Sequence, residues 1–546
     1  MKPTIRKPKG LFPLFTLLFL FAFVAFFRIH EQGLLYHDAA VNLLEAKFLQ
    51  EGLHILTTSR DRQTLKEPEG WEKIKSETVG VPPHHGKPGF NAILLTAGLL
   101  FGFQDSLPAR TTAFFSILNL VLTFLLVRKI SGPESAVYAT ALLASSVFYL
   151  VYARSGLADQ VVTTFFLLGI LFYFYEIEIS KKIFLYASGA SLGYAFASNQ
   201  WRSAYMIGLF IGIEVLSCFW KRKGVKEWRK RTAALLSGFF TPLVFFQIPY
   251  WIAQSAVGSL PFRDYWAQLG ERILQLGGLV WFRDVGELAR EFWIVEGPAF
   301  PILIFVGWIF LIVRFLSKRR WSDLFLLFFS LVPFAYFSVM KYNGQALPRT
   351  VASILPLLSA VAGESLWIVQ NRIRLKFSLS QKSNALLSAV LWIGILGLTF
   401  SRNLQAGITR SGYAEASRYL GSTGEKKLMI LGMEPLWRFY LGRVAYEPYS
   451  RPTSLEAMIR QARSQNIRYV LVDYSTLHSK YGCAFTAALP EWFKPRAVFS
   501  NPRGVSLPYL LDDFGLAGSL KISQDSRNQE IYVFDIKEMA DQLRDP

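Results

Sequence analysis

The stretch LFPLFTLLFLFAFVAFF (residues 11–27) decides the fold class, because it carries no charged side chain. Its length is close to the ~20 residues that a helix needs to cross a bilayer. Similar blocks with few charges return at residues 109–127, 134–151, 232–252, 297–316 and 346–369. Hydrophobic residues make up 52% of the 546 residues, and soluble domains do not collect them into such blocks. The sequence therefore predicts a polytopic α-helical membrane protein.

Basic residues gather in the short segments between these blocks. The net charge is +20, and most of the excess lies at residues 2–9, 127–132, 180–182, 221–231, 317–321 and 370–382. Short loops rich in Lys and Arg mark the cytoplasmic side of a membrane protein. This placement accounts for the charge, so no nucleic-acid partner is expected. VAFFRIH (24–30) offers no small-residue cleavage site, so we expect a retained first helix and a cytoplasmic N-terminus.

One topology puts every basic cluster on the cytoplasmic side. In this topology residues 28–108 are external, and PGFNAILLTAGLLFGF (88–103) lies in the membrane interface, since about 16 residues are marginal for a crossing. Counting that segment as a span would move every later basic cluster outside. The predicted spans are 11–27, 109–128, 134–151, 159–178, 183–198, 203–220, 232–252, 297–316, 322–340, 346–369 and 384–400. They give about eleven transmembrane helices, within a range of about 11–13.

The character of the chain changes after residue 402. KKLMILGM (426–433), IRYVLVDYS (467–475) and EIYVFDI (530–536) are typical of buried strands, and a helical pattern over 454–466 separates the first two. Strands that alternate with helices predict a small α/β domain. We therefore divide the chain into a transmembrane domain (1–402) and an external domain (403–546).

The segment LLYHDAAVNLLEA (34–46) follows the first span and places His37 and Asp38 at the external membrane surface. Its apolar residues recur with helical spacing. An Asp before such a helix is often an N-cap, whose side chain binds free backbone N–H groups. The same carboxylate is also placed to act on a molecule bound at the surface. Both roles stay open, and Asp38 is the first candidate for chemistry.

Lys87 is the second candidate, in VPPHHGKPGF (81–90) before the interfacial segment. Pro88 follows it and favours an extended backbone at Lys87. A lysine at this depth either snorkels toward lipid headgroups or holds a phosphate as a point charge.

Two further external turns carry ionisable residues at the mouths of spans. Asp159 opens a span in YARSGLADQVV (152–162), with Arg154 five residues earlier. The helix dipole alone would stabilise an acid there, and the same position aims Asp159 at the external surface. Arg202 lies in the turn SNQWRSAY (198–205), against the general charge pattern.

The late segment KYNGQALPRTVASILP (341–356) adds Gln345 and Arg349 to the candidates. Ionisable groups at membrane depth are costly and are usually functional. Five of the six histidines lie in the first external segment, at His30, His37, His54, His84 and His85. They show no HxxxH or HxH spacing, so no metal site is expected.

Four features of residues 11 to about 400, taken in their order along the chain and on the predicted external side, resemble a known arrangement. The features are Asp38 after the first span, Lys87–Pro88 before an interfacial helix, R-x(4)-D from Arg154 to Asp159, and P-R-x(6)-P from Pro348 to Pro356. Together they resemble the bacterial branch of the protein O-mannosyltransferase and aminoarabinose transferase superfamily, which are GT-C glycosyltransferases. The chain differs in having Ala39 where family members usually have Glu, and Gly86 and Gly89 around Lys87–Pro88.

The resemblance implies an inverting transfer of a sugar from a polyprenyl-phosphate donor to an acceptor hydroxyl or phosphate. It implies Asp38 as the general base, with Asp159 orienting the acceptor or holding a cation. It further implies that Lys87, Arg202 and Arg349 bind the donor phosphate, with supporting roles for His37, His85, Arg154 and Gln345. No cofactor and no metal are expected. The implied partners are the lipid-linked donor, membrane lipids, and a lipid, glycan or protein acceptor.

The resemblance also implies the inner (plasma) membrane of a bacterium, with the active site and the C-terminal domain in the periplasm. Three other interpretations stay open. A transporter or flippase of lipid-linked substrates usually shows paired repeats and broken helices, which the sequence lacks. A ligase of the O-antigen type tends to place its key residues in a large late loop. A pseudoenzyme with a structural role is the third.

Overall fold

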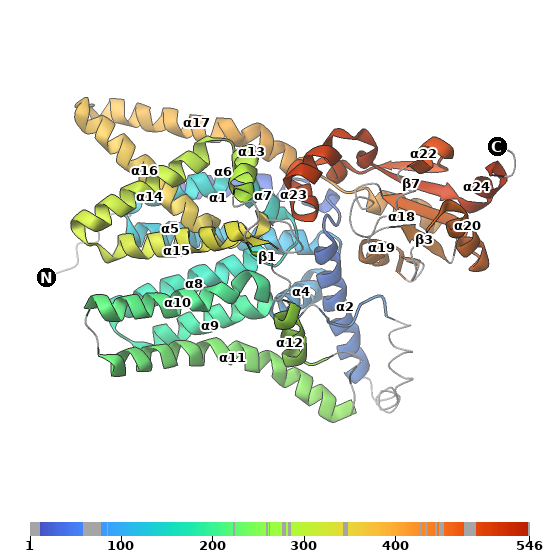
Figure 1. The fold of residues 1–546 in the computed structure, drawn as a ribbon, viewed down its shortest axis with the longest axis horizontal. Helices are drawn as coiled ribbons and strands as arrows, with labels where there is room; N and C mark the ends of the chain where they lie inside the picture. The colour runs from blue at the N-terminus through green and yellow to red at the C-terminus, as the bar shows by residue number, and fades with distance from the viewer. Residues whose placement is uncertain are drawn as a thin grey trace.

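The structure is a computed structural model that describes most of the chain. The described residues are 11–57, 78–84, 86–221, 224–257, 260, 263–275, 280–281, 286–341, 348–425, 427–431, 434–442, 445–446, 453–473 and 488–543. Two of the predicted site residues, His85 and Gln345, lie outside these ranges. The described chain forms a bundle of long helices with a smaller α/β part at one end (Figure 1).

The long helices run roughly side by side and occupy the predicted spans (Figure 1). They are α1 (Leu11–Phe26), α5 (Leu107–Ile130), α8 (Asp159–Ile179), α9 (Lys182–Ser198), α10 (Gln200–Lys221), α11 (Val225–Val257), α14 (Ala299–Lys318), α15 (Trp321–Val339), α16 (Leu355–Lys376) and α17 (Gln381–Ile408). Among the described residues, seven helices are long and apolar enough to cross a membrane, or eight with one bent pair. A polytopic membrane protein is confirmed, and the total of about eleven spans stays a prediction.

The predicted span 134–151 is not one straight helix, which corrects the sequence analysis. It divides into α6 (Pro133–Ser145) and α7 (Val147–Arg154), which meet at 62°. Ser146 has an extended backbone and caps α7, since its hydroxyl accepts from Tyr149 N. The Glu296 carboxylate accepts from Val147 N and Phe148 N at 3.1 and 2.8 Å. A break at membrane depth is tolerated because these side chains satisfy the N–H groups it frees.

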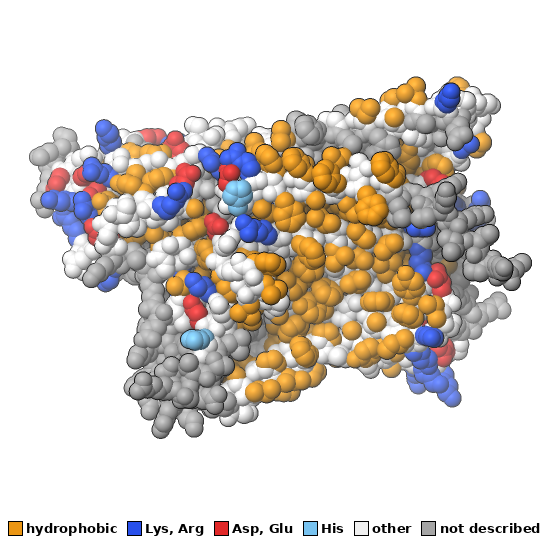
Figure 2. Space-filling view, turned by 180° about the vertical axis from the view of Figure 1, so that it is seen from behind, with side chains coloured by type: hydrophobic (Ala, Val, Ile, Leu, Met, Phe, Trp, Pro, Cys, Tyr) orange, Lys and Arg blue, Asp and Glu red, His pale blue; other side chains and the backbone are white. Residues whose placement is uncertain are grey.

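The surface of the bundle separates apolar from charged side chains. Hydrophobic side chains cover a broad band over the long helices, and charged side chains lie at both ends of this band (Figure 2). The connections between α10 and α11, between α14 and α15 and between α16 and α17 lie at one end of the bundle (Figure 1). We call it the basic end, and we call the opposite end, which holds the α/β part, the rim.

Shorter helices lie across the rim. They are η1 (Ile29–Glu31), α2 (His37–Thr57), α4 (Pro88–Phe101), α12 (Tyr265–Gln275), α13 (Glu287–Glu296) and η4 (Pro348–Ile354), with a small antiparallel pair of β1 (Val280–Trp281) and β2 (Met340–Lys341). α2 runs across the ends of the long helices (Figure 1). α4 is apolar but has only 14 residues, about two-thirds of a crossing length.

A five-stranded sheet follows the last long helix, in the order β4-β3-β5-β7-β6. Its strands are β3 (Leu428–Leu431), β4 (Ala445–Tyr446), β5 (Tyr469–Asp473), β6 (Ala497–Ser500) and β7 (Glu530–Asp535). β4, β3 and β5 are parallel, and β7 is antiparallel to both of its neighbours. Its helices are α18 (Tyr413–Ser422), α19 (Glu434–Leu441), α20 (Leu455–Ser464), α22 (Leu489–Trp492), α23 (Leu507–Gln524) and α24 (Ile536–Gln542). All residues of β3 and β5 are buried, as a covered parallel sheet requires.

The α/β part packs directly on the rim. The Tyr440 hydroxyl, in α19, accepts from Leu34 N and donates to Asp105, both at 3.0 Å. The Tyr509 hydroxyl, in α23, donates to Ala406 O at the end of α17. α17 reaches Ile408, so the last long helix ends beyond the predicted boundary at 402. The rim of the bundle and the α/β part therefore share one hydrophobic interior.

Candidate active site at the rim

Asp38, Lys87 and Arg349 meet at the rim although they are far apart in the sequence. Asp38 Oδ2 lies 3.7 Å from Lys87 Nζ and 3.3 Å from Arg349 Nη1. The Asp38 side chain is 29% exposed, whereas Lys87 is buried. We call these three residues the rim cluster. It places one carboxylate between two cations at the surface of the bundle.

The start of α2 positions Asp38. The helix begins at His37, so Asp38 lies in its first turn rather than at the N-cap considered from the sequence. His37 Nδ1 lies 3.7 Å from Asp38 Oδ1. His37 was expected only in a supporting role, and the structure places it against the other oxygen of the same carboxylate.

Two carboxylates of α2 fix the segment that carries Lys87. Glu45 accepts from His84 N at 2.9 Å and from Asn91 Nδ2 at 2.7 Å, and Glu51 accepts from Gly80 N. Glu45 is fully buried. Glu45 was not among the residues predicted from the sequence, although it lies two helical turns beyond Asp38 on the same face of α2.

The backbone around Lys87 turns sharply. Gly86 has a φ of +62°, which glycine adopts without strain, and its carbonyl accepts from the Gln200 side chain. Lys87 has φ −111° and ψ 53° and directly precedes the first turn of α4. The extended backbone expected before Pro88 is therefore wrong. The tight turn allows the Lys87 side chain to point to Asp38 instead of toward the lipid headgroups.

Arg349 belongs to the 3₁₀ helix η4, which starts at Pro348 and leads into α16. Its backbone N–H donates to Asp512 Oδ1 at 3.0 Å. Asp512 lies in α23 of the α/β part and is only 6% exposed. No site residue was predicted in the α/β part, because the sequence around Asp512 does not indicate that its side chain lies against η4.

Asp159 and Arg202 form a second, buried pair. Arg202 Nε lies 3.4 Å from Asp159 Oδ1, and both side chains are at most 7% exposed. These two atoms have no hydrogen-bond partner among the described residues, so the contact is between charges without hydrogen-bond geometry. The structure therefore favours Asp159 as the holder of a cation, one of the two roles considered for it.

Tyr152, at the end of α7, lies among these charges. It is 1% exposed, and the described residues offer its hydroxyl no hydrogen-bond partner. The charges of Asp512, Asp159 and Arg349 all act on it. Buried hydroxyls are normally paired, so Tyr152 is a polar group left available beside the rim cluster.

Arg154 lies elsewhere, which corrects its supporting role. Its Nη1 donates to the carbonyls of Val24, Ala25 and Phe27 at 3.3, 2.9 and 2.9 Å. These carbonyls end the helix α1 and have no partner further along it. Arg154 therefore binds the C-terminal end of α1 and makes no described contact with Asp38, Lys87 or Arg349.

The charges around Asp38 set its pKa. Partial burial raises the pKa, but Lys87, Arg349 and His37 lower it more, and the result lies well below the usual aspartate range. Nearby cations favour the ionised carboxylate in this way. Asp38 is therefore a carboxylate at neutral pH. Among the described residues no group of three His, Cys, Asp or Glu side chains could hold a metal ion.

Comparisons with known proteins agree with this architecture. Residues 84–251 match the family described as dolichyl-phosphate-mannose-protein mannosyltransferase. No curated protein sequence matches the chain.

Solved structures share the fold of most of the chain. ArnT from Cupriavidus metallidurans bound to undecaprenyl phosphate has a TM-score of 0.55 and 12% identity, with 96% of this chain and 98% of that chain covered. The oligosaccharyltransferase from Archaeoglobus fulgidus in the apo form has a TM-score of 0.54 and 13% identity, with 85% and 70% covered.

The archaeal oligosaccharyltransferase AglB from Archaeoglobus fulgidus, in complex with an inhibitory peptide and a dolichol-phosphate, has a TM-score of 0.51 and 12% identity. The match covers 84% of this chain and 69% of that chain. The chain thus has the GT-C fold. Together with the family match, this fold indicates a glycosyltransferase.

Proposed function

We propose that this chain transfers a sugar from a polyprenyl-phosphate donor to an acceptor hydroxyl or phosphate at the rim, with inversion at the anomeric carbon. The observation that carries the proposal is the rim cluster, in which Asp38 lies 3.3 Å from Arg349 and 3.7 Å from Lys87. A base and two phosphate-binding cations are the groups that such a transfer needs. The fold supports the donor class, since ArnT with this fold has been solved bound to undecaprenyl phosphate.

In the proposed reaction with a hydroxyl, the acceptor oxygen attacks the anomeric carbon on the face opposite the phosphate. A new carbon–oxygen bond forms, and the bond from the anomeric carbon to the phosphate oxygen breaks. The hydroxyl proton passes to Asp38, and the electron pair leaves with the polyprenyl phosphate. General-base catalysis of this kind contributes about 10²- to 10⁴-fold.

The cations of the rim cluster act on the leaving group. A sugar phosphodiester carries one negative charge, and the released monoester carries more, so charge develops on the phosphate during the reaction. Lys87 and Arg349 are held in place by buried segments before the donor arrives. Fixed charges aimed at developing charge stabilise the transition state more than the ground state.

The donor also adjusts Asp38. Without donor, both cations contact its carboxylate and depress its pKa, which makes it a weak base. A bound phosphate takes over part of their field, so the pKa of Asp38 rises when the donor is in place. Asp38 thus gains basicity only in the donor complex.

Arg202 and Asp159 have a less direct role in this proposal. They are buried as a pair, and the charge of Arg349 acts on Arg202. We place Arg202 behind Arg349, where it adds to the positive field at the phosphate. The reaction as written uses only side chains of this chain, with no cofactor and no metal.

The chain would work in the inner membrane of a bacterium, with the basic end in the cytoplasm and the rim outside. The basic clusters at residues 221–231, 317–321 and 370–382 fall at the helix connections of the basic end, and this supports the orientation. The donor tail would then lie in the membrane while its phosphate reaches the rim cluster. The acceptor would be a glycolipid, another glycan or a protein at the periplasmic surface.

The test is mass spectrometry of the glycolipids and glycoproteins of cells that produce the wild-type chain, Asp38→Asn or no chain. The matched control is Asp541→Asn, since Asp541 is an exposed carboxylate on α24. We expect one glycosylated product that depends on the wild-type chain and the control and is lost with Asp38→Asn. A product unaffected by Asp38→Asn, or no product that depends on the chain, contradicts the proposal and favours a transporter.

A further inference from the structure

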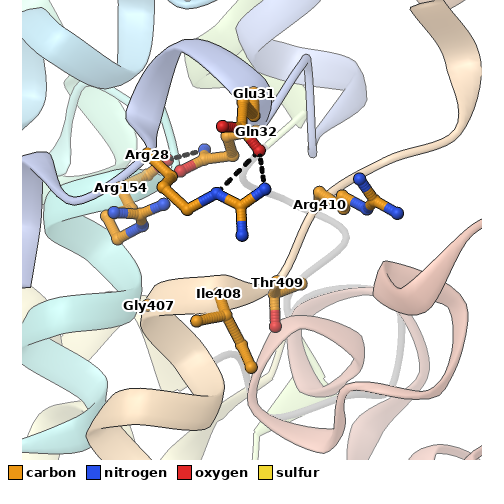
Figure 3. A pocket seen from close by; sticks show the side chains of 8 residues that line it. All are labelled: Arg28, Glu31, Gln32, Arg154, Gly407, Ile408, Thr409 and Arg410. Atoms are coloured by element: carbon orange, nitrogen blue, oxygen red, sulfur yellow. Dashed lines mark hydrogen bonds and ion pairs between the residues drawn. The ribbon is translucent and has the colours of Figure 1, made fainter. Parts of the chain in front are cut away.

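A second charged pocket lies at the rim, between the end of α1 and the end of α17 (Figure 3). Its volume is about 250 Å³. Arg28, Arg154 and Arg410 line it together with Glu31 and Gln32, and Ile408 forms an apolar part of the wall. It shares no residue with the rim cluster or with the Asp159–Arg202 pair.

The pocket carries an excess of positive charge. Three guanidinium groups line it against one carboxylate. Arg28 Nε donates to Glu31 at 2.7 Å, which neutralises one of the three. Arg410 is exposed and lines the opposite side of the pocket, with its guanidinium group pointing away from those of Arg28 and Arg154 (Figure 3). The pocket is therefore suited to an anion.

Two buried polar atoms in the lining indicate a missing partner. Arg154 is 1% exposed and Gln32 is 2% exposed. Within the described ranges, Arg154 Nε and Gln32 Oε1 have no hydrogen-bond partner. Buried groups of this kind are nearly always satisfied, and a ligand with both acceptor and donor oxygens would satisfy them.

Lipid-facing helices lead up to the pocket. Phe23 and Phe27 at the end of α1 are 60% and 38% exposed, and Leu404 and Ile408 at the end of α17 are 46% and 53% exposed. The two helices come close at Gly407, where an added Cβ atom would lie 3.6 Å from the Val24 side chain. A ligand in the pocket can therefore place an apolar tail on these helices without leaving the membrane.

We infer that this pocket binds the phosphate headgroup of an anionic membrane lipid. The cationic lining accepts the phosphate through charge-assisted hydrogen bonds, and the helix ends below it accept the acyl chains. The volume suits a small headgroup rather than a sugar chain. The lipid would connect the first and last long helices to the α/β part. Arg410 directly precedes Ser411 at the start of that part, and the Ser411 backbone N–H donates to Gln32 O.

The test is native mass spectrometry of the full chain in detergent, titrated with three probes. Phosphatidic acid carries both phosphate and tails, diacylglycerol with the same chains lacks the phosphate, and inorganic phosphate lacks the tails. The variant is Arg28→Gln with Arg410→Gln, and the matched control is Arg418→Gln, an exposed arginine on α18. Arg154 is left unchanged because it holds the end of α1.

We expect the wild-type chain and the control to retain one tightly bound phosphatidic acid and no diacylglycerol. The double variant should lose about tenfold or more in affinity, since each charge-assisted bond is worth a factor of that order. Equal binding by the wild-type chain and the double variant, or binding of diacylglycerol as strong as that of phosphatidic acid, overturns the inference. If inorganic phosphate binds as strongly as phosphatidic acid, the pocket binds free phosphate and the inference of a lipid ligand is wrong. Neither result depends on transfer activity.

Discussion

The rim cluster and two arginine-centred triads toward the basic end use the same residue types in opposite proportions. At the rim, one carboxylate lies between two cations at 3.3 and 3.7 Å. In the first triad, Arg231 lies between Glu176 and Glu214, with bonds of 2.6 to 2.8 Å. In the second, Arg314 lies between Asp323 and Glu364, with bonds of 2.5 to 2.9 Å.

The burial and the contact distances of the two regions differ, and they indicate a structural role for the triads and a chemical role for the rim cluster. All three residues of the Arg231 triad are at most 6% exposed and their bonds are short, and they tie α8, α10 and α11 together. The rim cluster has long contacts, and its carboxylate is 29% exposed. A buried arginine satisfied by two acids has nothing left to bind. The rim cluster instead holds two cations to one partly exposed acid, which is the balance of charge that a phosphate-binding site needs.

The largest effect is expected from Asp38→Asn. Transfer should fall about 10²- to 10⁴-fold because the base is lost. The stability of the fold should not change. Binding of polyprenyl phosphate should be retained or strengthened, since the Asp38 charge no longer competes with the phosphate for Lys87 and Arg349. Turnover of the product found by mass spectrometry and titration with polyprenyl phosphate measure the two effects. Weaker binding of the phosphate by this variant would place Asp38 with the structural triads.

Arg231→Met should instead act on stability. It leaves two buried carboxylates without a counter-charge, which costs about 3–5 kcal/mol. Thermal unfolding in detergent should show a lower midpoint and a lower yield, with normal turnover in the folded fraction. Lys182→Met is the control, because Lys182 is exposed near the same end and should change stability by about 0.5 kcal/mol or less. A normal midpoint for Arg231→Met would remove the contrast between the two regions.

The sequence was sufficient to predict features that depend on runs of residues. Apolar blocks predicted the membrane-spanning helices, and alternating strand and helix patterns predicted the α/β part, since both follow from hydrophobic periodicity. It also indicated Asp38, Lys87 and Arg349, because ionisable groups beside spans stand out in an apolar background. The break at Ser146 was not predicted, because it depends on Glu296, which is distant in the sequence and satisfies the freed N–H groups.

The rest of the site depends on how the chain folds back on itself. Asp512 is one of many acids of a polar domain, and only the packing of α23 on η4 gives it a role. Arg154 has the spacing of a site residue, but its side chain reaches the end of α1. The sequence could not distinguish these cases because side-chain direction at a helix end is set by the neighbouring helices.

Arg349→Gln should weaken donor binding rather than the fold. Loss of one charge-assisted contact predicts about 10- to 100-fold weaker binding of polyprenyl phosphate. Arg372→Gln is the control, since Arg372 is an exposed arginine near the end of α16 that lies at the basic end. Titration with polyprenyl phosphate measures the difference. Unchanged binding with a lowered unfolding midpoint would assign Arg349 a structural role like that of Arg231.

The pH profile tests the field of the cations at Asp38. The base is active when ionised, so activity is lost as the pH falls below its pKa. Because that pKa is depressed, kcat/KM of the wild-type chain should persist to lower pH than an ordinary aspartate allows. Arg349→Gln removes one of the depressing charges, so the acid limb of its profile should move to higher pH. An acid limb at the same pH in both chains would show that Arg349 does not act on Asp38.

The smallest effect is expected at Asp512, where the α/β part reaches the site. Asp512→Asn keeps an oxygen that accepts from Arg349 N but removes a negative charge near the cations. Binding of polyprenyl phosphate should therefore strengthen, by about two- to tenfold, while kcat changes little. Asp512→Ala removes the bond as well, so it should lower kcat by loosening η4. If both variants only lower the unfolding midpoint, Asp512 anchors the domain as Arg231 anchors its helices. If Asp512→Asn strengthens binding, the α/β part moderates the positive field of the rim.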